Sequence, residues 1–244
     1  MRVTGVRTLT APNPGFFTLD GTRTYVVGDR RVAVIDPGPQ DEGHLESITG
    51  LTARAESVVI LLTHDHADHA AGATALAEMV GGLVYGPGGP GAVEDSSRFG
   101  TDAGALVAVS TPGHTEEHFC YHLPEAGAVF VGDLLLGEGD TTWVGEYDGG
   151  VADYLASLVR LETLEAGVLF PGHGPPLVDA AGAIARFRGH RTARIDQVSQ
   201  VLDELQDASV AQILERVYGG IPESLLPAAR RSIEAILDYL GQGE

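Results

Sequence analysis

Short runs of apolar and β-branched residues, separated by Gly- and Pro-rich turns, fill the first two thirds of the chain. Runs of this length and composition predict β-strands. We expect strands at residues 2–10, 24–27, 32–35, 57–63, 83–85, 105–110, 118–123, 128–131 and 168–170. The run 57–63 (SVVILLT) is apolar throughout, which is typical of a strand buried on both faces.

Apolar residues recur at helical spacing between some of these strands and throughout the end of the chain. This spacing predicts helices at residues 70–80, 151–164, 180–206, 209–218 and 222–240. Strands mixed with helices, followed by helices alone, are typical of an α/β body with a helical appendage. We therefore expect a catalytic domain over residues 1–179 and a helical C-terminal region over residues 180–244.

Charge and composition exclude several kinds of chemistry. The 244 residues include 34 acidic and 15 basic side chains, a net charge of −19, and this acidity disfavours binding to duplex DNA. All basic residues are arginines, which excludes a lysine Schiff base and the lysine of a phosphate-binding loop. The single cysteine, Cys120, excludes an internal disulfide framework and a zinc cluster of several cysteines.

The start of the chain, MRVTGVRTLTAPNPG, lacks the continuous apolar stretch of a secretory signal. No apolar run approaches the length of about 18–20 residues that spans a bilayer. We therefore expect a cytoplasmic protein that acts without a membrane partner.

Three histidines and two aspartates lie within the seven residues from Thr63 to His69, between a buried strand and a helix. His64 and His66 are two apart in an extended segment, so their side chains project to the same side. Asp68 and His69 follow at the helix start and can point to a second place nearby. Imidazole and carboxylate groups bind Zn²⁺ without any cysteine, so the segment predicts a metal site.

Three further polar residues follow the ends of later predicted strands. His114 lies in the turn TPGHT, Asp133 follows the apolar run VFVG, and His173 lies in the turn PGHG. Strand ends that lead into loops are where α/β folds place functional groups. Each residue could serve only a structural turn, but together with the first cluster they predict one shared metal centre.

The segment His-Asp-His-Ala-Asp-His resembles the His-x-His-x-Asp-His signature of the metallo-β-lactamase superfamily. The resemblance implies that His64, His66 and His114 bind a first metal ion. It implies that Asp68, His69 and His173 bind a second ion, and that Asp133 bridges the two. The implied fold is a four-layer αβ/βα sandwich with a small, winged-helix-like C-terminal part.

The chain also resembles one subgroup of this superfamily, the β-lactamase-like protein 2 group. The segments that carry this resemblance are FFTLDGTRTYVVG, TPGHTEEH, GDLLLGEG, PGHGP, GHRTARIDQ and SVAQILERVYGGIPESL. A eukaryotic member of the group acts on single-stranded RNA, which makes single-stranded RNA one candidate partner.

These patterns predict a dinuclear metal-dependent hydrolase, loaded with Zn²⁺ or, as alternatives, Mn²⁺ or Fe²⁺. A hydroxide bridging two ions forms near neutral pH and attacks an acyl centre without a protein nucleophile. We expect Asp68 and Asp133 to act in catalysis as well as in binding. The expected substrate is a small ester, thioester or lactone; the alternatives are a single-stranded RNA endoribonuclease and a mononuclear iron oxidoreductase resembling persulfide dioxygenases.

Two residues near the predicted centre each allow two interpretations. His118 lies four residues after His114, and we interpret it as a residue behind the ligands or beside the substrate, or as an ordinary strand residue. Trp143 ends the Gly-rich loop that follows Asp133, and we interpret it as a substrate contact or as part of a surface turn. Arg186, Arg188, Arg191 and Arg194 crowd one helix, where they could bind phosphate, meet solvent or pack on the acidic body.

Overall fold

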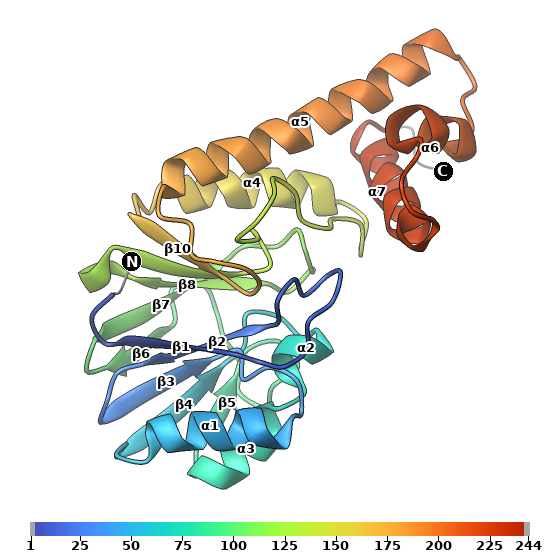
Figure 1. Cartoon of the computed structure of the whole chain (residues 1–244). Helices are drawn as coiled ribbons and strands as arrows, with labels where there is room; N and C mark the ends of the chain where they lie inside the picture. The colour runs from blue at the N-terminus through green and yellow to red at the C-terminus, as the bar shows by residue number, and fades with distance from the viewer. Residues whose placement is uncertain (1–2, 242–244) are drawn as a thin grey trace.

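Two five-stranded sheets face each other in the computed structural model, which describes residues 3–241 (Figure 1). The first sheet has the order β1 (Val6–Thr10), β2 (Arg23–Val27), β3 (Arg31–Ile35), β4 (Ser57–Leu61) and β5 (Leu83–Tyr85). The second has the order β10 (Val168–Pro171), β9 (Ala128–Gly132), β8 (Phe119–Leu123), β7 (Gly104–Ser110) and β6 (Arg98–Thr101). A 3₁₀ turn, Pro124–Ala126, joins β8 to β9.

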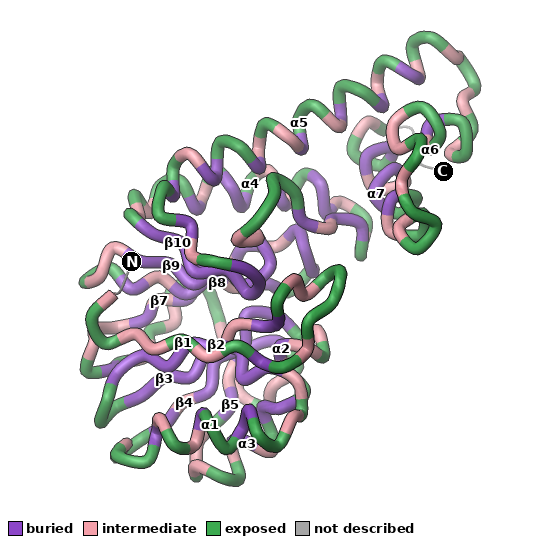
Figure 2. Tube along the Cα trace, in the orientation of Figure 1, coloured by how far each residue is buried: buried purple, intermediate pink, exposed green. Residues whose placement is uncertain are grey.

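Helices cover the outer face of each sheet and complete the expected four layers (Figure 1). The helices α1 (Glu42–Thr52) and α3 (Ala73–Val80) cover the first sheet, and α4 (Gly150–Glu162) and α5 (Ala180–Glu204) cover the second. One apolar core lies between the sheets, and a further core lies under each helical layer. Figure 2 shows the central strands of the sheets mostly buried and the outward faces of the helices exposed.

The C-terminal helices continue from the far end of α5. They are α6 (Val210–Tyr218) and α7 (Leu226–Tyr239), with the 3₁₀ turn η2 (Glu223–Leu225) before α7. Ile213 of α6 and Ile233 of α7 belong to the same apolar cluster as residues of α4 and α5. This shared core holds the C-terminal helices against the body. Among residues 3–241, no helix combines the length and the apolar character needed to cross a bilayer.

Several elements differ from the sequence-based expectation. The first strand begins only at Val6, and Arg2 lies outside the described residues. The helix expected at 70–80 is two helices, α2 (Ala67–Ala70) and α3, with Gly72 between them. At Gly72 the loop before α1 packs close, since a Cβ there would lie 3.0 Å from the carbonyl oxygen of Pro39. Strand β6 was not predicted, because its four residues (RFGT) carry no continuous apolar pattern.

Strand direction brings the functional segments to one edge of the sandwich. β3 and β4 are parallel, so Asp36 and the turn after β4 lie side by side. β7, β9 and β10 share a direction, because β8 is antiparallel to β7 and β9 and β10 is parallel to β9. Two tyrosines join the strand ends of the two sheets. Tyr25 Oη donates to the carbonyl of Pro171 at 2.6 Å, and Tyr121 Oη donates to that of Leu62 at 2.8 Å.

Candidate metal centre

Seven side chains from four segments, each following a strand, converge at this edge. Their donor atoms form three overlapping groups, and the atoms within each group lie within 4.8 Å of one another. The groups are His64, His66 and His114; His64, His69 and Asp133; and Asp68, His69 and His173. These are the seven residues that the sequence singled out, and segments far apart in the chain bring them together.

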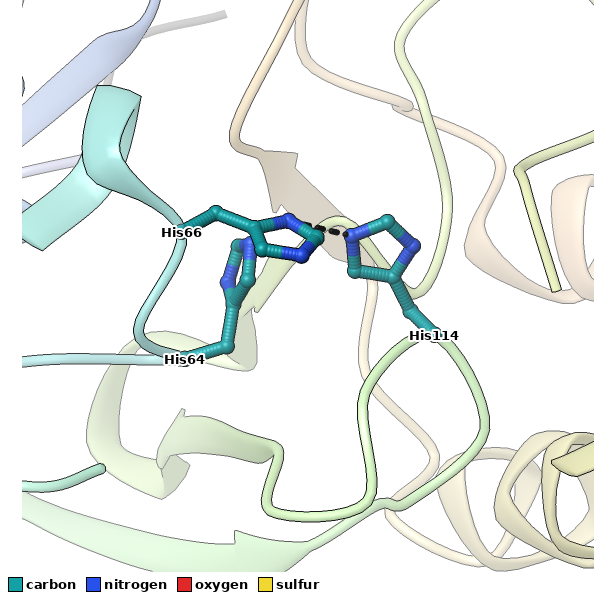
Figure 3. Close-up of side chains that lie close together, drawn as sticks. All are labelled: His64, His66 and His114. Atoms are coloured by element: carbon teal, nitrogen blue, oxygen red, sulfur yellow. Dashed lines mark hydrogen bonds between the residues drawn. The ribbon is translucent and has the colours of Figure 1, made fainter. Parts of the chain in front are cut away.

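The first group consists of three imidazoles (Figure 3). His66 Nδ1 lies 3.2 Å from His114 Nε2, and the His64 ring packs edge-on to both, with centroids 4.7 and 5.0 Å away. Ring nitrogens of the three histidines thus converge, and one of them, His64 Nε2, is buried and has no hydrogen-bond partner in the described part of the chain.

The second group mixes imidazoles with carboxylates. His173 Nε2 lies 3.2 Å from His69 Nε2, 3.2 Å from Asp68 Oδ2 and 3.3 Å from Asp133 Oδ2. Asp133 Oδ2 also lies 3.8 Å from His114 Nε2, so this carboxylate stands between the two groups. Its Oδ1 is buried without a hydrogen-bond partner among the described residues.

The partners of the outer ring nitrogens determine which nitrogen is free to bind. The carbonyl oxygen of Trp143 can only accept, so His114 Nδ1, at 2.9 Å, must carry the proton. Glu146 Oε2, a carboxylate oxygen, likewise accepts a hydrogen bond from His66 Nε2 at 3.1 Å. In the neutral rings, His114 Nε2 and His66 Nδ1 therefore turn lone pairs toward each other across 3.2 Å. Such an arrangement suits a metal cation shared by the two nitrogens.

Asp36 accepts a hydrogen bond from a histidine of the second group, as Trp143 and Glu146 do from histidines of the first. Its Oδ2 accepts from His69 Nδ1 at 3.0 Å and from Thr63 Oγ1 at 2.7 Å, and its Oδ1 accepts from Thr63 N at 2.8 Å. The residue is 2% exposed and has a φ of 49°, in the left-handed region. The sequence around Asp36, Asp-Pro-Gly, is typical of a turn and does not by itself indicate a contact with the cluster.

Two further polar residues that contact the cluster, Thr22 and Glu146, were not predicted from the sequence. Thr22 Oγ1 donates to Asp68 Oδ2 at 3.4 Å, and its hydroxyl accepts from Asn13 Nδ2 at 2.9 Å. Glu146 lies 80 residues from His66 and carries no motif of its own. No local pattern marks such residues, because each acts through a contact distant in sequence.

Burial and the two carboxylates set the protonation of the cluster. Burial is the largest influence on the pKa of His69, but Asp133 and Asp36 overcome it and raise the pKa well above its usual value. Burial is likewise overcome at His173, where Asp133 and Asp68 raise the pKa to about 9. Burial and the neighbouring imidazoles lower the pKa of His64. His69 and His173 in turn lower the pKa of Asp133, despite its burial.

A cavity of about 510 Å³ opens beside the metal-binding groups. Trp143 lines it, as do His66, His114, Asp68, Asp133 and His173 from the cluster and Thr142 from the loop. The other lining residues are Phe17, Leu136, Ser224, Pro227, Ala228 and Arg231. The cavity is therefore bounded on one side by the metal-binding edge and on the other by η2 and α7.

His118 lies behind the cluster and away from this cavity. It is 1% exposed, its Nδ1 lies 3.0 Å from Thr111 Oγ1, and burial lowers its pKa to about 3. Its ring centroid is 5.3 Å from that of His64. This position suits a residue that supports His64 and leaves no contact with a molecule in the cavity.

The four arginines of α5 are engaged within the protein. Their contacts are Arg186 with the carbonyl of Gly139, Arg188 with Glu162, Arg191 with the carbonyl of Thr142, and Arg194 with the carbonyl of Val217. Arg191 is buried over the Tyr154 ring, and Arg194 stacks on Tyr218. Packing, rather than an open phosphate site, accounts for this cluster.

Residues 18–87 and 82–173 match the model of the metallo-beta-lactamase superfamily. The chain belongs to the metallo-β-lactamase superfamily. Residues 209–242 match the beta-lactamase associated winged helix domain, as expected for the C-terminal part. The chain is therefore an enzyme, a hydrolase of the metallo-β-lactamase fold. Its cluster of His and Asp residues is compatible with the binding of divalent metal.

Similar proteins in this superfamily cover most of the chain. A beta-lactamase-like protein 2 homolog from Caenorhabditis elegans is 29% identical over 93% of this chain and 81% of its own length. An atrochrysone carboxyl ACP thioesterase from Paecilomyces divaricatus is 30% identical over 85% of this chain and 69% of its own. The crystal structure of a metallo-beta-lactamase family protein from Thermus thermophilus aligns with a TM-score of 0.81 at 22% identity, covering 98% of this chain and 94% of that one.

Proposed function

We propose that this member of the metallo-β-lactamase superfamily is a dinuclear metal-dependent hydrolase of acyl bonds, with thioesters foremost and esters and lactones as related substrates. The observation that carries the proposal is the convergence of imidazole nitrogens and carboxylate oxygens beside a cavity. The thioesterase name of a relative that is 30% identical supports acyl chemistry in particular.

The donor set fits two divalent ions. His64, His66 and His114 would hold one ion, and Asp68, His69 and His173 would hold the other. Asp133, whose Oδ2 lies 3.8 Å from His114 Nε2 and 3.3 Å from His173 Nε2, would be shared between them. Imidazole and carboxylate donors favour Zn²⁺, with Mn²⁺ and Fe²⁺ as alternatives. When bound, two such ions supply hydroxide near neutral pH and polarise a carbonyl oxygen.

The residues of the chain position the reactants. Asp68 and Asp133 reach the cavity from the cluster, so their carboxylates can orient the attacking oxygen. Trp143 and Leu136 give the cavity an apolar wall that excludes bulk water from the acyl group. In the reaction, water adds to the acyl carbon and the carbon–sulfur bond breaks. The products are a carboxylate, a thiol and a proton.

Metal analysis and a substrate panel test the proposal together. The purified protein should hold close to two divalent ions per chain, and a chelator should abolish activity that added metal restores. The panel contains thioesters, lactones, esters, a β-lactam and single-stranded RNA. His66→Ala and Asp133→Ala should each lose at least about a hundredfold in kcat/KM on the best acyl substrate. His122→Ala, on β8 outside the cluster, serves as the control.

Other outcomes would overturn the proposal in distinct ways. A single iron with persulfide oxidation would indicate the oxidoreductase. Cleavage of single-stranded RNA, with binding that weakens steeply as salt rises, would indicate the endoribonuclease. Near-normal activity of either alanine variant would mean that the assigned ligands do not bind the metal.

A further inference from the structure

The wall of the cavity that faces the metal-binding edge comes from one face of the C-terminal helices. Ser224, Pro227, Ala228 and Arg231 line it, at intervals of three, four and seven residues from the first. This spacing places all four on the same side of a helix. Three are small and leave the volume open, so Arg231 alone extends a long side chain from this wall.

Arg231 is the one arginine among the described residues that line the cavity. The other ionisable lining side chains, three histidines and the carboxylates of Asp68 and Asp133, all belong to the metal-binding cluster. In a chain with a net charge of −19, a cation at this position stands out. Its guanidinium is therefore the natural counterpart of an anion that enters the cavity.

The existing partner of Arg231 leaves its charge incompletely neutralised. Glu234 Oε2 accepts from Arg231 Nη1 at 3.3 Å, and Glu234 Oε1 accepts from Arg230 Nε at 2.9 Å. One carboxylate therefore serves two guanidinium groups, which leaves a positive charge on the pair. The Arg231 side chain is 67% exposed, so most of its donors are free to bind a ligand.

Apolar residues line the cavity together with Arg231. Leu136 and Trp143 form part of the wall, and Phe17, which is 61% exposed, adds an aromatic ring. The loop that carries Phe17 is held in place, since Asn13 accepts from Thr22 N at 2.9 Å. Phe17 thus adds exposed apolar surface to the cavity, which the apolar part of a ligand can cover.

We propose that Arg231 binds an anionic group of the acyl substrate, a carboxylate or a phosphate, at the end remote from the bond that is cleaved. The apolar part between these two ends would lie against Phe17 and Trp143. The inference rests on the proposed acyl hydrolase function and adds its substrate class. Arg231 is a specificity-determining residue, because it contacts a group that does not react.

Paired substrates test this assignment. One pair consists of pentanoyl and glutaryl thioesters of N-acetylcysteamine, which differ mainly in a terminal carboxylate. A second pair consists of butanoyl thioesters of pantetheine and of 4′-phosphopantetheine, which differ in a phosphate. The wild-type enzyme should prefer the anionic member of at least one pair, and the preferred pair identifies the source of the anion.

Arg231→Gln should reduce this preference about 10- to 100-fold in kcat/KM, chiefly through KM, because it removes a charged hydrogen bond. Arg231→Lys should restore part of the preference, since the charge returns without the planar fork. Arg230→Gln is the matched control, because Arg230 shares Glu234 and does not line the cavity. Equal effects of Arg230→Gln and Arg231→Gln, or no preference in the wild type, would overturn the assignment.

A binding measurement separates this inference from the proposed function. If the wild type hydrolyses neither member of either pair, acyl hydrolysis itself fails. Calorimetric titration with glutarate, with 4′-phosphopantetheine and with pentanoate then still tests Arg231. Glutarate or 4′-phosphopantetheine should bind at least about tenfold more tightly to the wild type than to Arg231→Gln. Equal affinities of the wild type and of Arg231→Gln for glutarate and for 4′-phosphopantetheine would refute the anion site independently of catalysis.

Discussion

Asp36 offers the sharpest test of how the protein prepares its metal-binding atoms. Its carboxylate is not one of the candidate metal-binding groups. It accepts a hydrogen bond from His69 Nδ1, however, and holds the turn before His64 through Thr63. Replacing Asp36 by Asn preserves the shape and the bond from Thr63 N to Oδ1. It also preserves the left-handed backbone, which Asn adopts readily. The change therefore isolates one loss, the acceptor at Oδ2.

The magnitude follows from the bonds at that oxygen. The Thr63 hydroxyl can rotate and accept from the new amide, but His69 Nδ1 would face an amide that cannot accept its proton. A hydrogen bond to a charged acceptor is worth about 1.5–3 kcal/mol. Since about 1.4 kcal/mol corresponds to a tenfold change, we expect metal affinity to fall about 10- to 100-fold in Asp36→Asn.

Competition with a chromogenic chelator measures this affinity in the wild type and the variant at one pH. Asp41→Ala is the control, because Asp41 caps α1 through His44 N at 2.8 Å and lies outside the metal-binding cluster. It should cost about 1 kcal/mol of unfolding free energy and leave metal affinity unchanged. An Asp36→Asn affinity within twofold of the wild type would refute this account of His69.

Two further predictions concern packing and pH. Gly172→Ala should abolish metal-dependent activity, since its Cβ would overlap Asp133 Oδ1 and lie 2.5 Å from His69 Cε1; Gly189→Ala, with open space around it, should not. Backbone N–H groups of the turn before β3 lower the pKa of Asp102 to about 2, so its charged form stabilises the folded state. The urea midpoint of the wild type should exceed that of Asp102→Asn at pH 6, and the gap should narrow as pH falls from about 4 toward 2. A gap that stays constant over that range would contradict the second prediction.

Much of the fold was predictable because strands and turns leave local signals. The apolar run that ends at Thr63 predicted a buried strand, and β4 occupies it. His114, Asp133 and His173 each follow a predicted strand, so a common edge could be inferred before any coordinates were known. Ion binding by these residues stays a prediction, because close donor atoms establish only that the geometry suits it.

Long-range contacts explain what the sequence could not predict. Asp36 accepts from His69 across 33 residues, and Glu146 meets His66 across 80, so neither contact leaves a periodic pattern. The sequence also predicted a helix over α7 without indicating that its first turns close the cavity. That placement depends on how α5 carries the last helices back toward the metal-binding edge (Figure 1).

The two faces of α7 are under different constraints. Ile233, Ile236 and Leu237 anchor one face in the apolar core, while Ala228 and Arg231 meet the cavity. Exchanging side chains on the cavity face would therefore alter which molecules are accepted, with the catalytic edge and the stability of the helix left in place. For protein engineering, α7 is accordingly a compact region for diversification, in which a small library could redirect selectivity without rebuilding the chemistry.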